Sequence, residues 1–141
     1  MSDAPQAVVR ALLSAWGSPE PDVDEVASFL SDDVEYFDSG TGVHHGIEAA
    51  KDDLRKQIAT GFEDNTIEVR SLVADGPKVM VERTDRFTMD GKRITMVFNA
   101  AFEVNRDGRV KRWIDIYDVK ALHDDLQAAG VDVAAAAARH A

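Results

Sequence analysis

The fold prediction starts from residues 78–119, KVMVERTDRFTMDGKRITMVFNAAFEVNRDGRVKRWIDIYDV. Apolar and polar side chains alternate along this stretch, which is the period of β-strands with one buried face. Asp-Gly pairs at 90–91 and 107–108 interrupt the alternation, and Asp-Gly is a preferred hairpin turn. The same pattern begins earlier in the chain, so the sequence predicts an antiparallel meander of strands. The predicted strands are 66–74, 78–89, 92–105 and 109–119.

The chain before this meander has the period of helices. Apolar side chains at i, i+3, i+4 and i+7 predict an amphipathic helix over 5–17, and similar stripes predict a short helix from Asp22 and a helix over 47–60. A short strand, 34–38, lies between them, and a last helix is expected at 120–129. Helices followed by antiparallel strands indicate an α+β fold in which helices cover one face of a curved sheet. We expect one domain over residues 1–141, with 131–141 as a frayed or helical tail.

Charge and composition exclude several classes of function. The 26 Asp and Glu residues outnumber the 16 Lys and Arg residues, which gives a formal charge of −10. Such a surface repels nucleic acid and anionic membranes, so neither is an expected partner. The chain has no cysteine, which excludes thiolate catalysis and Cys-ligated metals. The N-terminus lacks a basic leader and no apolar run approaches the length of a membrane span, so we expect a cytoplasmic protein.

Two predicted strands carry charged residues on the face that should be buried. On strand 78–89 the odd positions are apolar apart from Arg83 and Asp85. On the last strand, Asp115 shares a face with Trp113 and Tyr117. A buried charge without a partner costs several kcal/mol, so these residues either form an internal ion-pair network or belong to a functional site. The residue pattern alone leaves both interpretations open.

Three motifs together resemble the limonene epoxide hydrolase family. They are Arg83-Thr84-Asp85, Trp113-Ile114-Asp115-Ile116-Tyr117-Asp118 and Tyr36-Phe37-Asp38, and the similarity runs from about Val8 to Leu122. The resemblance implies the nuclear transport factor 2-like, SnoaL-like fold. That fold is a cone-shaped, curved, mixed or antiparallel sheet with three N-terminal helices enclosing a pocket.

The resemblance also implies a reaction, which is one-step hydrolysis of a small apolar epoxide to a vicinal diol without metal or cofactor. Asp115 would deprotonate a water that Tyr36 and Asp38 also hold, Asp85 would protonate the epoxide oxygen, and Arg83 would bridge the two carboxylates. A base on the water side and an acid on the oxygen side suit this chemistry. The side chains expected to line the pocket are Trp113, Tyr117, Phe87 and Phe98.

One position departs from the family and keeps two alternatives open. The family usually has Asn where this chain has Asp38, and an ionised carboxylate only accepts hydrogen bonds. Asp38 also resembles the base of ketosteroid isomerase, so an isomerase or polyketide cyclase is one alternative. However, Ala100 stands near the position of that enzyme's oxyanion-hole acid. A non-catalytic module that binds a small ligand as a dimer is the other.

Apolar residues on both faces of the last two strands predict a homodimer. Val97, Ile114 and Ile116 lie on the face opposite the expected core and would be exposed without a second sheet against them. We interpret the remaining polar signals as structural. His44 and His45 are expected in a solvated loop, Ser39–Gly42 as a turn, and the pairs Asp32-Asp33, Asp52-Asp53 and Asp124-Asp125 at helix ends or polar faces.

Overall fold

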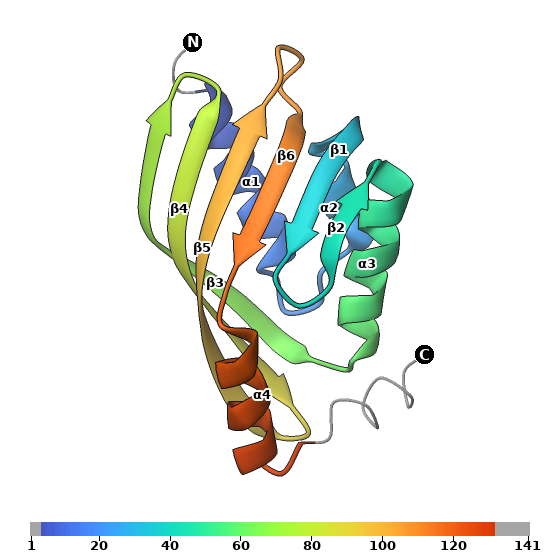
Figure 1. The fold of residues 1–141 in the computed structure, drawn as a ribbon, viewed down its shortest axis with the longest axis vertical. Coiled ribbons are helices and arrows are strands. Elements are labelled where there is room, and N and C mark those ends of the chain that lie inside the picture. Colours follow the sequence, from blue (N-terminus) through green and yellow to red (C-terminus); the bar gives the residue numbers. More distant parts are fainter. Residues whose placement is uncertain (1–3, 132–141) are drawn as a thin grey trace.

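A computed structural model describes residues 4–131 of the chain. It contains four helices and six strands in this part (Figure 1). The helices are α1 Ala4–Trp16, α2 Val23–Ala27, α3 Ile47–Ala59 and α4 Val119–Ala128. All four agree with the predicted helices, and Asp22 caps α2 by accepting from the backbone N–H of Asp24 at 2.9 Å. The predicted tail lies, from residue 132 on, outside the described residues.

The strands form one open, mixed sheet in the order β2-β1-β6-β5-β4-β3. Their bounds are β1 Leu30–Asp38, β2 Gly42–His45, β3 Glu63–Asp75, β4 Lys78–Met89, β5 Lys92–Val104 and β6 Val110–Ile116. Strands β3 to β6 form the predicted antiparallel meander. Strand β1 pairs in parallel with β6, the last strand of the meander, and β2 lies outside β1. Figure 1 shows the long strands β3 to β5 bending along their length, with α1 and α2 behind the sheet. The α+β fold class predicted from the sequence is confirmed.

Strand β2 corrects the expected loop after the first strand. Residues 42–45 pair antiparallel with β1, with His44 opposite Tyr36 and Gly42 opposite Asp38. Gly42 has a φ of 90°, which a glycine adopts without the strain that a side chain would cause. The interpretation of His44 as a solvated loop residue is therefore wrong, because its ring stacks on Tyr36 with 5.8 Å between centroids. Four residues are too few for a strand period to be visible in the sequence.

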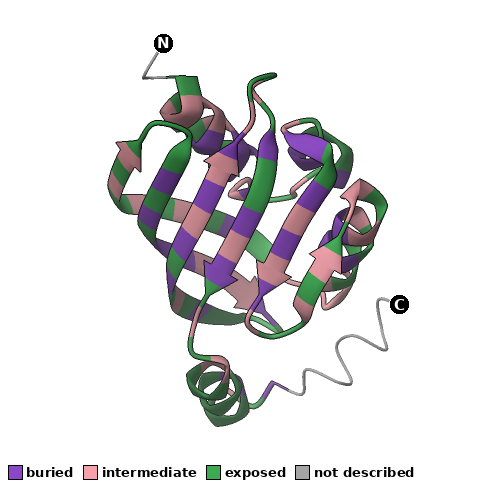
Figure 2. Cartoon of the chain, turned by 45° about the horizontal axis from the view of Figure 1, so that its top comes forward, coloured by how far each residue is buried: buried purple, intermediate pink, exposed green. Residues whose placement is uncertain are grey.

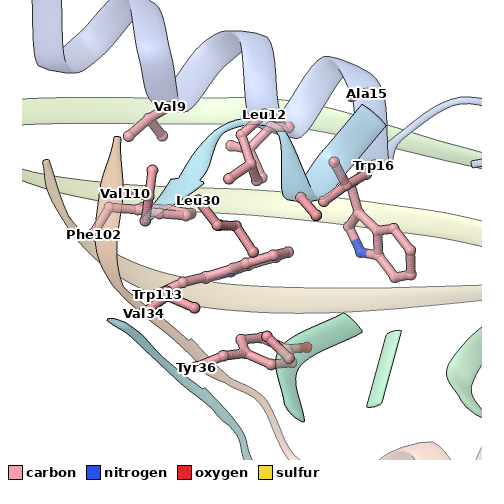
Figure 3. Close-up of a cluster of buried hydrophobic side chains, with 14 of the residues drawn as sticks. Val9, Leu12, Ala15, Trp16, Leu30, Val34, Tyr36, Phe102, Val110 and Trp113 are labelled. Carbon is pink, nitrogen blue, oxygen red and sulfur yellow. The ribbon is translucent and has the colours of Figure 1, made fainter. Parts of the chain in front are cut away.

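The main hydrophobic core lies between α1 and the inner face of the sheet (Figure 3). Val9 and Leu12 of α1 are fully buried and face Trp113 of β6, which is also fully buried. Tyr36 of β1 packs beside Trp113, with 4.6 Å between ring centroids, because the parallel register places the two residues opposite each other. Figure 2 shows the alternation of buried and exposed residues along the strands that separates this inner face from the outer one.

Candidate active site

A pocket of about 240 Å³ opens on the inner face of the sheet, beyond the main core. Its walls are mostly apolar and come from α1, α4 and strands β4 and β5, whereas three carboxylates and one guanidinium form a polar region. Three of the side chains predicted to line it do so. The lining includes Asp38, Gly40, Thr41, Gln57, Arg83, Asp85, Phe87, Phe98, Asp115 and Tyr117. Trp113 is the exception, because it lies fully buried in the core.

Arg83 joins the two carboxylates that the sequence placed on the buried face. Its Nε and one terminal nitrogen donate to Asp85 at 2.9 and 3.1 Å, and its two terminal nitrogens donate to Asp115 at 2.7 and 3.0 Å. Asp85 is on the same strand, but Asp115 is on β6, so the side chain of Arg83 reaches across β5. Opposite Asp115, β5 carries Ala100, whose single methyl group adds little bulk at this level. The guanidinium lies 4.2 Å from the centre of the Phe98 ring.

This ion-pair cluster is buried and strongly polarised. Arg83 is 0% exposed, Asp115 2% and Asp85 6%. Burial alone would lower the pKa of Arg83, but the carboxylates of Asp115 and Asp85 outweigh it and raise that pKa, so the guanidinium stays charged. Burial raises the pKa of Asp85, although the contacts with Arg83 partly oppose the rise. The ion-pair network that one of the two interpretations predicted is present, and it also forms part of the pocket wall.

Trp113 orients Asp115 from below the pocket. Its indole Nε1 donates to Asp115 Oδ1 at 2.8 Å, so that oxygen receives bonds from both Trp113 and Arg83. The other oxygen, Oδ2, receives only the bond from Arg83 and keeps capacity for another donor. The role of Trp113 is therefore to hold Asp115, and the core packing of its ring makes that hold rigid.

Asp38 is a third buried carboxylate, brought beside Asp115 by the parallel pairing of β1 and β6. Its Oδ1 accepts from the Tyr117 hydroxyl at 2.7 Å and from the backbone N–H of Gly40 at 2.8 Å. Its Oδ2 faces the Tyr36 hydroxyl at the longer distance of 3.5 Å. Burial raises the pKa of Asp38, and the bonds from Tyr117 and Gly40 oppose that rise.

Position 40 needs a glycine because the Tyr117 hydroxyl and the Asp38 carboxylate come close to its Cα atom. A Cβ atom on residue 40 would lie 2.4 Å from the Tyr117 hydroxyl oxygen and 3.2 Å from Asp38 Oδ1. A side chain there would separate the two groups. Ser39 adds a second tie, because its hydroxyl accepts from the backbone N–H of Tyr117 at 3.1 Å and so joins the ends of β1 and β6.

Sequence reasoning missed a set of polar residues behind Tyr36. Asp53 was assigned to a polar helix face, but it is 4% exposed, so that interpretation is wrong. Gln57, one helical turn later, donates from Nε2 both to Asp53 Oδ2 and to the Tyr36 hydroxyl, each at 2.9 Å. A signal was present, because Ala50, Asp53, Leu54 and Gln57 have the i, i+3, i+4, i+7 spacing of one helix face.

The geometry brings together all five predicted site residues. Asp38, Arg83, Asp85 and Asp115 line one end of the pocket, and the buried Tyr36 contacts Asp38 there without lining the pocket itself. Within residues 4–131, no group of three or more His, Asp or Glu side chains is arranged to hold a metal ion. None of the helices in the same range is long and apolar enough to cross a membrane. What the site offers is an acid and bases: carboxyls with different environments, positioned against an apolar cavity.

Comparisons with known proteins agree with this description. The SnoaL-like domain model matches residues 9–113. The chain is 34% identical over 119 residues to epoxide hydrolase EphG of Mycobacterium tuberculosis. The aligned residues make up 84% of this chain and 76% of the relative. A solved structure of an M. tuberculosis LEH-like epoxide hydrolase matches with a TM-score of 0.73 and 28% identity, over 90% of this chain and 92% of that one.

A more distant structural match extends the fold to another kind of enzyme. SalBIII, an epoxide hydrolase/cyclase-like enzyme in pyran ring formation in salinomycin, matches with a TM-score of 0.72 at 19% identity, over 85% of this chain and 96% of that one. At this identity the likeness concerns the fold alone. Taken with the match over residues 9–113 and the geometry of the pocket, these findings mean that the chain belongs to the SnoaL-like domain family, on the nuclear transport factor 2-like fold, with epoxide hydrolases among its relatives.

Proposed function

We propose that this protein is a cofactor-independent epoxide hydrolase that adds water in one step to a small, mostly apolar epoxide and gives a vicinal diol. The observation that carries the proposal is the bridging of Asp85 and Asp115 by the fully buried Arg83 at one end of an apolar pocket. This arrangement supplies two carboxyls on one rigid support, and epoxide hydrolysis needs one as acid and the other as base. The relationship to EphG supports the same chemistry.

In the proposed reaction, Asp115 accepts a proton from water as the water oxygen attacks an epoxide carbon. The carbon–oxygen bond of the ring breaks, and Asp85 transfers its proton to the leaving oxygen, which becomes the second hydroxyl of the diol. The raised pKa of Asp85, caused by burial, favours its role as the acid. After product release Asp115 loses a proton and Asp85 regains one, so the net reaction consumes only water. Tyr36 and Asp38 hold the attacking water.

The pocket suits a small substrate with little charge. Its volume of about 240 Å³ is below the roughly 300–1,000 Å³ of typical ligand pockets. Away from the carboxylates the walls are aromatic and aliphatic, and the formal charge of −10 disfavours anionic substrates. The decisive experiment is turnover of a varied epoxide panel with analysis of the diols. If none of the epoxides in the panel gave a diol, the proposal would be contradicted.

The one-step mechanism has its own test, which is a single turnover in ¹⁸O-labelled water. Direct attack by water puts the label in the diol and none in Asp115. A covalent ester would instead leave label in the Asp115 carboxylate, which mass spectrometry of the digested protein would detect. Asp115→Asn is expected to fold normally and to lose activity, whereas in a non-catalytic binding module it would change affinity only.

An isomerase or cyclase that uses Asp38 as its base is the second candidate. It is favoured by the raised pKa of Asp38 and by the free capacity of its Oδ2 atom beside the pocket. The two candidates differ in which residues they need. Hydrolysis depends on Arg83 and Asp115 and tolerates Asp38→Asn, whereas the isomerase or cyclase reaction is lost with Asp38 and is less sensitive to Arg83.

We also propose that two copies associate through the outer face of the sheet. One apolar row crosses all six strands in register on this face: Val43, Phe37, Ile114, Ala101, Met80 and Val73. Val73 is 65% exposed and Met80 54%, and burying such a continuous row favours association of identical surfaces. Sedimentation of wild type should give a dimer and Met80→Glu a monomer. A monomeric wild type at micromolar concentration would contradict this.

A further inference from the structure

A chain of hydrogen bonds connects Tyr36 to polar residues of α3 and β2 and of the turn between β1 and β2. We call Asp53, Gln57, Thr41 and His44 the Asp53 network. Gln57 Nε2 bonds to Asp53 Oδ2 and to the Tyr36 hydroxyl, each at 2.9 Å, and Thr41 Oγ1 bonds to the same Asp53 oxygen at 3.1 Å. His44 Nε2 lies 3.0 Å from Thr41 Oγ1 and 3.5 Å from Asp53 Oδ1. The network connects buried Asp53 to a residue of the proposed reaction.

The chemistry of Asp53 decides the direction of these bonds. A carboxylate only accepts hydrogen bonds, so the Gln57 group that faces Asp53 is the amide NH₂ and not the carbonyl oxygen. The same nitrogen carries a second hydrogen, which it donates to the Tyr36 hydroxyl oxygen. If the amide of Gln57 were reversed, its oxygen would face the Asp53 carboxylate with no hydrogen between them. Asp53 thereby makes Gln57 a donor to Tyr36.

The donor and acceptor roles of Thr41 and His44 are also determined by Asp53. Thr41 has one hydroxyl hydrogen, and it is used to donate to Asp53. The short contact between Thr41 Oγ1 and His44 Nε2 therefore needs the hydrogen of His44 Nε2. His44 therefore donates to Thr41, and Thr41 donates to Asp53. Gln57 donates both to Asp53 and to Tyr36. Each member of the network excludes the reverse arrangement of its neighbour.

We infer that Asp53 is a positioning residue, which acts through Gln57 to make the Tyr36 hydroxyl a hydrogen-bond donor toward Asp38, at the polar end of the pocket. The inference rests on the proposed function. Because Tyr36 already accepts from Gln57, its own hydrogen points toward Asp38 Oδ2, 3.5 Å away, and the space beside it. In the proposed reaction, a water beside these groups donates to Asp115 and accepts from Tyr36. One lone pair of the water oxygen then stays free to attack the epoxide.

The test reverses the bonds without removing them. In the double variant Asp53→Asn with Gln57→Glu, the amide and the carboxylate exchange places, so side-chain volumes, net charge and the number of bonds are conserved. The new carboxylate at position 57 accepts where Gln57 donated, and the Tyr36 hydrogen turns away from the pocket. We expect kcat to fall on the order of tenfold, with KM changed by less than about twofold and the urea midpoint near that of wild type. Wild-type kcat in the double variant would overturn the inference.

Two controls separate positioning from a general structural effect. Asp52→Asn removes a charge from the neighbouring, exposed position of the same helix and should leave kcat unchanged. In a Tyr36→Phe background the exchange at 53 and 57 should cost no further kcat, because the hydroxyl through which it acts is gone. The same tenfold loss in both backgrounds would assign Asp53 a merely structural role and overturn the inference.

A spectroscopic measurement tests the network independently of turnover. The chain has only two tyrosines, so ring Cζ labelling with ¹³C gives two signals, which Tyr117→Phe assigns. The exchange at 53 and 57 should shift the Tyr36 signal and leave that of Tyr117 in place. An unmoved Tyr36 signal would overturn the inference. If wild type hydrolyses no epoxide but the Tyr36 signal still moves alone, the proposed function fails and the hydrogen-bond direction stands.

Discussion

Buried carboxylates lie in and beside the pocket, in two regions that satisfy them differently. On the β4 and β6 side, Asp85 and Asp115 share the guanidinium of Arg83. On the β1 and α3 side, Asp38 is held by the Tyr117 hydroxyl and a backbone N–H, while Asp53 is held mainly by Gln57 and Thr41. A buried charge can be stabilised by an opposite charge or by neutral donors, and this protein uses both within one site.

Substitutions in the two regions are expected to change the free energy of unfolding by different amounts. Removing a neutral donor from Asp38 costs one hydrogen bond, whereas removing Arg83 leaves two buried carboxylates with no cation. The carboxyls beside the guanidinium of Arg83 also stay in place when they gain or lose a proton, because the guanidinium can donate hydrogen bonds to either form. Substitutions in the two regions test this contrast, and their expected effects differ in size.

The largest effect is expected for Arg83→Met. Asp85 and Asp115 would lose the cation that they share, and breaking a buried ion pair in this way costs about 3–5 kcal/mol of unfolding free energy. Catalysis should be lost as well. Urea denaturation measures the stability, and the deficit should shrink at low pH, where the buried carboxyls no longer carry a charge that needs a cation. A deficit equal at pH 4 and pH 8 would show that packing, and not charge, explains the loss.

Asp85→Asn should abolish turnover while leaving the fold intact. Loss of a general acid lowers the rate by about 10²-fold or more. Binding of an amide inhibitor, measured by calorimetry, should remain detectable. In wild type, kcat/KM should fall as pH rises through the raised pKa of Asp85, since the acid must carry its proton, and fall again in acid when the base is protonated. Near-normal turnover with an unchanged alkaline limb would remove Asp85 from the mechanism.

Asp38→Asn should have a small effect on epoxide hydrolysis, with activity equal to or above that of wild type. The amide oxygen can still accept from Tyr117 and Gly40, and it restores the residue usual in limonene epoxide hydrolases. Steady-state kinetics on an epoxide that wild type hydrolyses would measure this. Complete loss of activity in a folded variant would instead favour the isomerase or cyclase.

The smallest effect concerns stability and the same substitution. Burial raises the pKa of Asp38 in the folded protein, so the folded state holds its proton more tightly than the unfolded state does. This contribution to stability is complete below the unfolded pKa and is lost as pH rises through the folded pKa. Asp38→Asn should therefore have a higher melting temperature than wild type at pH 8, and the gain should vanish below about pH 4. An equal gain in melting temperature at pH 8 and below pH 4 would contradict a raised pKa of Asp38 as its cause.

Much of the site followed from the strand period, for a local reason. Alternation places residues two apart on one face, so Arg83 and Asp85 had to share a face with Val79 and Val81, and Asp115 with Trp113. The Asp-Gly turns determined where strands β4 and β5 meet, and β4 has the bounds predicted from the sequence. The burial of Arg83, Asp85 and Asp115 could therefore be predicted without a structure.

Tertiary structure decided which of these faces meet. Within residues 4–131, the four helices, five of the six strands and the three motifs could be predicted from the sequence, because helix and strand periods depend on neighbouring residues. The sequence did not determine that β1 inserts parallel to β6, which sets Asp38 beside Asp115 across 77 positions of chain. Nor did it reveal that Asp53 is buried, since only the packing of α3 against β1 and β2 removes that face of the helix from water. Pairing and burial depend on contacts between distant segments, and no local period records them.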